Sequence, residues 1–95
     1  MADKNLHLRY HGLFWKITGT RSQKLTTSAS TIIELLEELA IRHGAALHSE
    51  LFTGQNLNTR VVILINGQNI HHLQGAQTEI ENGDTVQLMP QVAGG

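Results

Sequence analysis

The sequence predicts an α+β fold in which one main helix packs on one face of a mixed four- to five-stranded sheet. Three observations predict it. Short stretches that alternate in polarity or are rich in β-branched residues, separated by turn residues, are typical of strands. Residues 31–43 instead carry apolar side chains at helical spacing. The chain has 95 residues, 40% hydrophobic and 16% charged, which suits a single domain over residues 1–95 with a modest core.

The first strand is predicted from Leu6, because Leu6, Leu8 and Tyr10 alternate with polar neighbours. Gly12 interrupts this pattern. The aromatic segment that follows lacks clean alternation, so we expect a bulge or an open loop over residues 12–19. A second strand, residues 23–27, then returns antiparallel to the first.

The helix at residues 31–43 has a sequence signal at each end. Thr31 and Glu34 form a capping box, with Ser30 as the competing cap, and Gly44 follows the last turn. A short helical turn that ends near Leu51-Phe52 and a polar loop over residues 53–59 are expected next. One amphipathic helix of this size covers one sheet face and leaves the other face open.

The C-terminal half contains the strongest strand, Arg60–Ile65, followed by the hairpin signal Asn66-Gly67. Residues 82–84 predict another turn and residues 85–89 the last strand. Pro90 is expected to end this strand because it lacks a backbone N–H. A flexible tail, residues 90–95, is expected to follow.

Strand parity predicts which apolar side chains lie on the open face. Gln87 is polar and shares a face with Met89, while Asn66 has the parity of Val62 and Leu64. Val62, Leu64 and Met89 are therefore expected to form a partly exposed, partner-facing patch. The alternative is an ordinary apolar surface or a different register.

Composition excludes several kinds of chemistry. The chain has no cysteine, so disulfides, thiolate metal sites and a cysteine nucleophile are excluded. No phosphate-binding glycine motif is present, the six histidines lack metal-ligand spacing, and no catalytic triad is convincing. We therefore expect no metal, no bound cofactor and no enzyme activity. The net charge of −1 argues against nucleic-acid binding, and the lack of a signal peptide or membrane span favours the cytoplasm.

The C-terminus is the informative feature. Val92 and Ala93 are small, and Gly94 and Gly95 have no side chains. Such a tail can thread a narrow channel of a partner, which binds Val92, Ala93 and Gly94 and reaches the α-carboxylate of Gly95. A carboxylate is inert until activated, and attack on the α-phosphate of ATP held by a partner would activate it.

These features resemble the MoaD/ThiS family of ubiquitin-like sulfur carrier proteins, which have the β-grasp fold. The resemblance covers nearly the whole chain and is strongest from Val61 to Gly95. It includes the Gly83-Asp84 turn, a hydrophobic strand, Pro90 and the terminal Gly-Gly. The other matching residues are Asn66, Gly67, Ile70, Leu73, Gly75, Thr78, Ile80, Val86, Val92 and Ala93.

The resemblance implies a mechanism and two partners. A ubiquitin-activating-type adenylyltransferase, similar to MoeB and ThiF, adenylates Gly95 with ATP, and a sulfur donor then replaces AMP to leave a thiocarboxylate. A second enzyme, such as the large subunit of molybdopterin synthase, receives the sulfur. The carrier itself holds no cofactor; it positions the reactive group.

The ending departs from the molybdopterin branch, because Met89 replaces an aromatic residue and Gln91 a second proline. Carriers that feed cysteine synthesis match it at least as well. Two other functions stay open: a protein modifier joined through Gly95 to lysines, and a binding module that acts through its open face.

Overall fold

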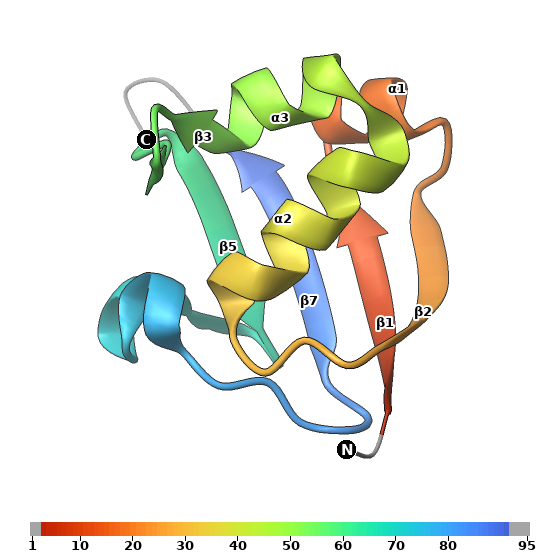
Figure 1. Cartoon of the computed structure of the whole chain (residues 1–95), viewed down its shortest axis with the longest axis vertical. Coiled ribbons are helices and arrows are strands. Elements are labelled where there is room, and N and C mark those ends of the chain that lie inside the picture. The colour runs from red at the N-terminus through yellow and green to blue at the C-terminus, as the bar shows by residue number, and fades with distance from the viewer. Residues whose placement is uncertain (1–2, 92–95) are drawn as a thin grey trace.

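The computed structural model describes residues 3–91 and contains a five-stranded mixed sheet (Figure 1). The strand order is β2-β1-β7-β5-β6. β1 and β7 run parallel, and the other neighbouring pairs are antiparallel. The sheet strands are β1 (Lys4–Tyr10), β2 (Ser22–Thr27), β5 (Val61–Ile65), β6 (Gln68–Asn69) and β7 (Thr85–Pro90).

The helices lie on one face of this sheet, and the longest of them crosses it diagonally (Figure 1). The α-helices are α1 (Leu13–Thr18), α2 (Ile32–His43) and α3 (Ala45–Leu51). The minor elements are a hairpin of β3 (Phe52–Thr53) and β4 (Asn56–Leu57), and the 3₁₀ turns η1 (Ile70–His72) and η2 (Gly75–Gln77). The predicted main helix on a mixed sheet is confirmed, with two further short α-helices.

The bulge or open loop expected over residues 12–19 is wrong, because residues 13–18 form α1. Gly12 and Gly19 flank this helix with φ of 59° and 80°, values that favour glycine. Phe14 is buried and Trp15 is partly exposed. Six residues make fewer than two turns, too few for a helical period to show in the sequence.

The predicted caps of α2 are present, with one difference. The Glu34 N–H donates to Thr31 Oγ1 (3.4 Å), so Thr31 is the N-cap residue. The Glu34 carboxylate accepts from the backbone N–H of Ser30 (2.8 Å) rather than from that of Thr31. Gly44 ends the helix with φ of 95°, as its place after His43 predicts.

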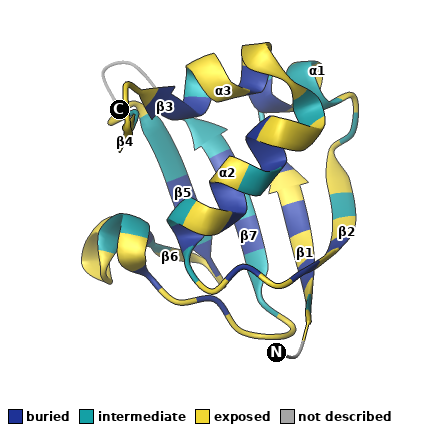
Figure 2. Cartoon of the chain, in the orientation of Figure 1, coloured by how far each residue is buried: buried dark blue, intermediate teal, exposed yellow. Residues whose placement is uncertain are grey.

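The core lies between α2 and the inner face of the sheet (Figure 2). Helix residues such as Leu36 and Leu39 pack with alternate residues of the three central strands. The buried residues of these three strands are Leu6, Leu8 and Tyr10 of β1, Val86 and Leu88 of β7, and Ile63 and Ile65 of β5. Every second residue of each strand therefore faces the helices, which fixes the register.

The predicted hairpin after β5 is confirmed. Asn66 and Gly67 both have positive φ, 50° and 87°, as a two-residue hairpin turn of this twist requires. The Asn66 side chain also joins the hairpin to β7: its Nδ2 donates to Asp84 Oδ1 (2.9 Å), and its Oδ1 accepts from the Thr85 N–H (3.0 Å).

Two further expectations need correction. The polar loop predicted for residues 53–59 contains most of the β3–β4 hairpin. The predicted start of the tail at Pro90 is wrong, because Pro90 is the last residue of β7 and pairs with Val61. Within residues 3–91, no helix is long and apolar enough to cross a membrane.

Candidate functional site: the end of β7 and the open sheet face

The predicted tail follows β7, a central strand of the sheet. β7 lies between β1 and β5 and is hydrogen-bonded to both. Beyond its last residue, the Gln91 N–H donates to the carbonyl oxygen of Arg60 (2.9 Å). Gln91 is thus held to the start of β5, and we refer to Pro90 and Gln91 as the tail root.

A glycine packs directly against the tail root. Gly12 precedes α1 with φ of 59° and ψ of −131°, a conformation that L side chains rarely adopt. A Cβ atom placed on Gly12 would lie 2.9 Å from Cγ and 3.2 Å from Cδ of Pro90. The absence of a side chain therefore lets the chain before α1 approach the ring of Pro90.

Asn58 supports Arg60, the residue that binds Gln91 on the other side of the tail root. Its Nδ2 donates to the Glu50 carbonyl oxygen (3.2 Å), and its Oδ1 accepts from the Arg60 N–H (2.9 Å). This side chain joins the end of α3 to the start of β5. A hollow of about 270 Å³ opens here, lined by Leu13, Phe14, Glu50, Asn58, Arg60, Val61, Pro90 and Gln91.

The open sheet face carries the predicted apolar patch. Val62 of β5 lies opposite Met89 of β7. Two residues further along β5, Leu64 lies opposite Gln87. All three apolar residues are half-buried on the face away from α2, where parity places them. That a partner covers this patch stays a prediction.

The same face has a polar group beside the patch. His11 Nε2 and Gln87 Oε1 lie 2.9 Å apart and form a hydrogen bond. His11 also donates its backbone N–H to the Leu88 carbonyl oxygen (3.0 Å), which extends the contact between the β1 end and β7. The patch is therefore bordered by an amide and an imidazole, both engaged within the chain.

The predicted site residues Val92, Ala93, Gly94 and Gly95 lie outside the described residues. Over residues 3–91, no three His, Asp or Glu side chains lie close enough together to hold a metal ion. The sequence interpretation missed Gly12, Asn58 and Arg60 as supports of the tail root. A glycine that breaks the β1 pattern was the available signal for the first; nothing local marks the other two.

Tyr10 is the titratable group with the clearest perturbation. Its ring lies in the core, and its hydroxyl donates to Gln23 Oε1 (2.9 Å). Burial raises the pKa of Tyr10 to about 12, partly offset by the positive charge of Arg42. The hydroxyl stays protonated at neutral pH, so this group is a structural donor rather than a base.

Comparison with known proteins identifies the family and the fold of this chain. The sequence model of the ThiS family matches residues 8–95. A protein of Archaeoglobus fulgidus that is provisionally named a sulfur carrier is 34% identical over 74 residues, 78% of each chain. Small archaeal modifier protein 3 of Haloferax volcanii is 30% identical over 91 residues, 95% of this chain and 98% of that one.

The solved structures confirm the β-grasp fold. The solution structure of small archaeal modifier protein 1 from Methanosarcina acetivorans superposes with a TM-score of 0.83 at 25% identity, over 100% of both chains. The family match covers almost the entire sheet, α2 and the sequence to Gly95. This chain, with its β-grasp fold and C-terminal Gly-Gly, belongs to the ThiS family of ubiquitin-like sulfur carriers and modifiers.

Proposed function

We propose that this chain is a sulfur carrier that acts through the α-carboxylate of Gly95. The observation that carries the proposal is the tail root: a central strand ends in Pro90 and Gln91, held on one side by Gly12 and on the other by Arg60. Val92, Ala93, Gly94 and Gly95 follow in the sequence. The described part of the molecule thus ends four residues before the proposed reactive group.

The proposed reaction has two steps on the terminal carboxyl group. A carboxylate oxygen of Gly95 attacks the α-phosphorus of ATP bound by a MoeB/ThiF-like adenylyltransferase, and pyrophosphate leaves. A sulfide donor then attacks the carbonyl carbon of the acyl-adenylate, AMP leaves, and a thiocarboxylate remains. ATP belongs to the partner, and the carrier contributes the carboxylate and its position.

The length of the tail limits where this chemistry can occur. Four extended residues span at most about 14 Å. The partner must therefore bring its ATP within that distance of Gln91, which requires close docking of the whole globule. The small side chains of Val92 and Ala93 suit a narrow channel.

The carrier that we propose is of the MoaD type, which leaves two candidates for the enzyme that accepts its sulfur. The two candidates are the large subunit of molybdopterin synthase and an enzyme of cysteine synthesis. Incubation of the thiocarboxylated chain with each acceptor and its substrate decides between them. The correct acceptor should return Gly95 to the carboxylate form and yield the sulfur-containing product, whereas the other should leave the thiocarboxylate intact.

A second function is favoured by one relative, the Haloferax volcanii protein named as a small archaeal modifier. The same acyl-adenylate could react with a lysine amine, so that AMP leaves and an isopeptide bond forms. Adducts of Gly95 with lysines of other proteins, identified by mass spectrometry of a cell lysate after protease digestion, would support this function. A lysate with free carrier only would argue against it.

Mass spectrometry of the intact chain tests the carrier proposal. After incubation with the cognate activating enzyme, ATP and sulfide, the mass should increase by the difference between sulfur and oxygen, located at Gly95. A variant that lacks Gly94 and Gly95 is the control; it should keep the circular dichroism spectrum of the wild type and gain no mass. An unchanged wild-type mass would refute the proposal.

A further inference from the structure

β2 is the outer strand of the sheet and, in the described part of the chain, pairs with β1 alone (Figure 1). The Tyr10 N–H donates to the Arg21 carbonyl oxygen (2.9 Å), so these two residues form a hydrogen-bonded pair at the end of the ladder. Bonded and non-bonded pairs alternate along antiparallel strands. The backbone N–H and C=O groups of Ser22, Lys24 and Thr26 therefore point away from β1, toward the free edge.

These backbone groups are almost without partners among residues 3–91. Thr20 Oγ1 donates to the Ser22 carbonyl oxygen (2.7 Å), and no other hydrogen bond within that range reaches them. The N–H groups of Ser22, Lys24 and Thr26 stay free, as do the C=O groups of Lys24 and Thr26. A strand edge with free donors and acceptors is a template for one more strand, whose backbone supplies the matching groups.

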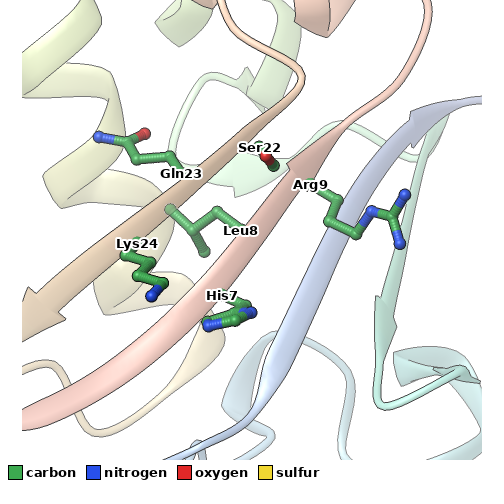
Figure 3. Close-up of a pocket in the computed structure, with 6 residues that line it drawn as sticks. All are labelled: His7, Leu8, Arg9, Ser22, Gln23 and Lys24. Carbon is green, nitrogen blue, oxygen red and sulfur yellow. The ribbon is translucent and has the colours of Figure 1, made fainter.

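The side chains at this edge add positive charge on the open sheet face. Lys24 is exposed and lies opposite His7 of β1, and Arg9 lies opposite Ser22. They border a shallow hollow of about 420 Å³, where Figure 3 shows Lys24 beside His7 and Arg9 directed over β7. The strands of the sheet contain no Asp or Glu, and the one ion pair within 4.0 Å among the described residues lies on α2. Lys24 therefore has no counter-ion there.

A second copy of this chain fits the edge poorly. Two antiparallel β2 strands use all the outward-facing residues in one register, which places Lys24 opposite Lys24 and Ser22 opposite Thr26. Like charges directly opposite each other destabilise a strand pair. An incoming strand with a carboxylate at that position instead forms an ion pair with Lys24, because opposite residues of an antiparallel pair project from the same face.

We propose that the free edge of β2 binds an extended, acidic peptide segment of a partner protein. The segment adds as an antiparallel strand along residues 22–26, and a carboxylate at its centre faces Lys24. A nucleic acid would use the cations only and leave the alternating N–H and C=O groups unpaired. This surface is separated from β7 and the tail root by β1, and its use does not require the carrier reaction.

Nuclear magnetic resonance of the full chain tests this with a synthetic probe, acetyl-Thr-Val-Glu-Val-Thr-amide. Strand addition should move the amide signals of Ser22, Lys24 and Thr26. Those of Gln23 and Leu25, whose N–H groups face β1, should stay nearly unchanged. The control peptide has Lys in place of Glu and should bind at least about fivefold more weakly, because it places like charges opposite each other.

Two variants separate the backbone contact from the charge. Thr26→Pro removes an outward N–H that β1 does not use, so the circular dichroism spectrum should be unchanged while the acidic peptide binds at least about fivefold more weakly. Lys24→Gln should bind the acidic and the basic peptide with similar affinity. Lys16→Gln is the control for charge, since Lys16 is exposed on α1, and it should discriminate between the peptides as the wild type does.

The inference would be overturned by absent or non-alternating shifts with the acidic peptide, or by equal binding of the two peptides to the wild type. Edge signals that move with protein concentration in the absence of peptide would also overturn it, because they would show that a second copy occupies the edge. Failure of the carrier function is distinguishable, because none of these measurements involves Gly95, ATP or sulfide.

Discussion

Gly12 and Pro90 are in contact so close that the first must lack a side chain: a Cβ atom on Gly12 would lie 2.9 Å from Pro90 Cγ. The two residues are far apart in the sequence. Their contact connects the entry to α1 with the end of β7, so the position of the last described residues depends on a residue of the N-terminal third.

Substitution Gly12→Ala should therefore destabilise the fold by about 2–4 kcal/mol, because it adds a clash to an unfavourable φ. Urea denaturation measures the free energy of unfolding. Gly19→Ala is a control for positive φ alone, since no atom lies within 4 Å of the position that its new methyl group would take. When Pro90 is already replaced by Ala, Gly12→Ala should lower the free energy of unfolding by at least about 1 kcal/mol less than it does in the wild type. This difference is the interaction energy expected for two residues in contact. An unchanged cost would show that Pro90 is not the obstacle.

Truncation of a core leucine should have a large effect on stability. Leu36 of α2 is 0% exposed, so Leu36→Ala removes packed volume and leaves a cavity; we expect a loss of about 2–5 kcal/mol. Ile41, on the same helix, is 84% exposed, and Ile41→Ala should change stability by less than about 0.5 kcal/mol. Chemical denaturation of both variants checks this. Similar losses for the two would contradict the burial of α2.

Stability should fall at alkaline pH through Tyr10. Its pKa is about 12 in the folded chain and 10.0 for an ordinary, fully hydrated tyrosine, so the folded state disfavours the phenolate. The stabilisation from the protonated hydroxyl is complete below pH 10 and is lost as the pH rises from 10 toward 12. Tyr10 is the only tyrosine, so the ultraviolet absorbance of phenolate reports it alone.

Tyr10→Phe provides the control for this pH dependence. The variant loses the hydrogen bond to Gln23, at a cost of about 1 kcal/mol at neutral pH. Between pH 10 and 12 its stability should fall less steeply than that of the wild type. Parallel curves, or a phenolate midpoint at 10, would contradict the assigned environment.

Polar substitutions on the apolar patch should weaken binding to the activating enzyme much more than they reduce the stability of the fold. Leu64 and Met89 are half-buried, so Leu64→Gln with Met89→Gln should cost only about 1–2 kcal/mol of stability. The affinity for the activating enzyme should fall by about tenfold or more, as for contacts at the centre of an interface. Ile41→Gln is the matched control on the helical face. Equal affinities for all three proteins would remove the patch from the docking surface.

The sequence predicts the elements whose signals are long or local. The α2 caps, Asn66-Gly67 and the parity of Val62 and Leu64 depend on neighbouring residues only. The helix α1 was missed because its six residues are too few to reveal a period, and its burial depends on contact with β7 and α3. The contacts of Gly12 with Pro90, and of Arg60 with Gln91, join distant segments. The glycine that breaks the β1 pattern is the one local sign of the first contact, and nothing local marks the second.

The position of Pro90 explains why the expectation that a proline ends the strand was wrong. The β5–β7 ladder has a hydrogen-bonded pair at each end. One pair is Asn66 with Thr85, and the other is Arg60 with Gln91. Because such pairs alternate with non-bonded ones, the pair of Pro90 with Val61 is non-bonded. On its other side β1 has already ended at Tyr10. The missing N–H of Pro90 is therefore not needed, and the strand continues through it.

The central position of β7 has a mechanical consequence. An edge strand such as β2 can peel away from its single neighbour one bond at a time. A pull along β7 from its C-terminal end instead loads the ladders with β1 and β5 together, in shear. An enzyme that binds the C-terminal end and applies force to it would therefore move the whole domain before it separated any strand from the sheet.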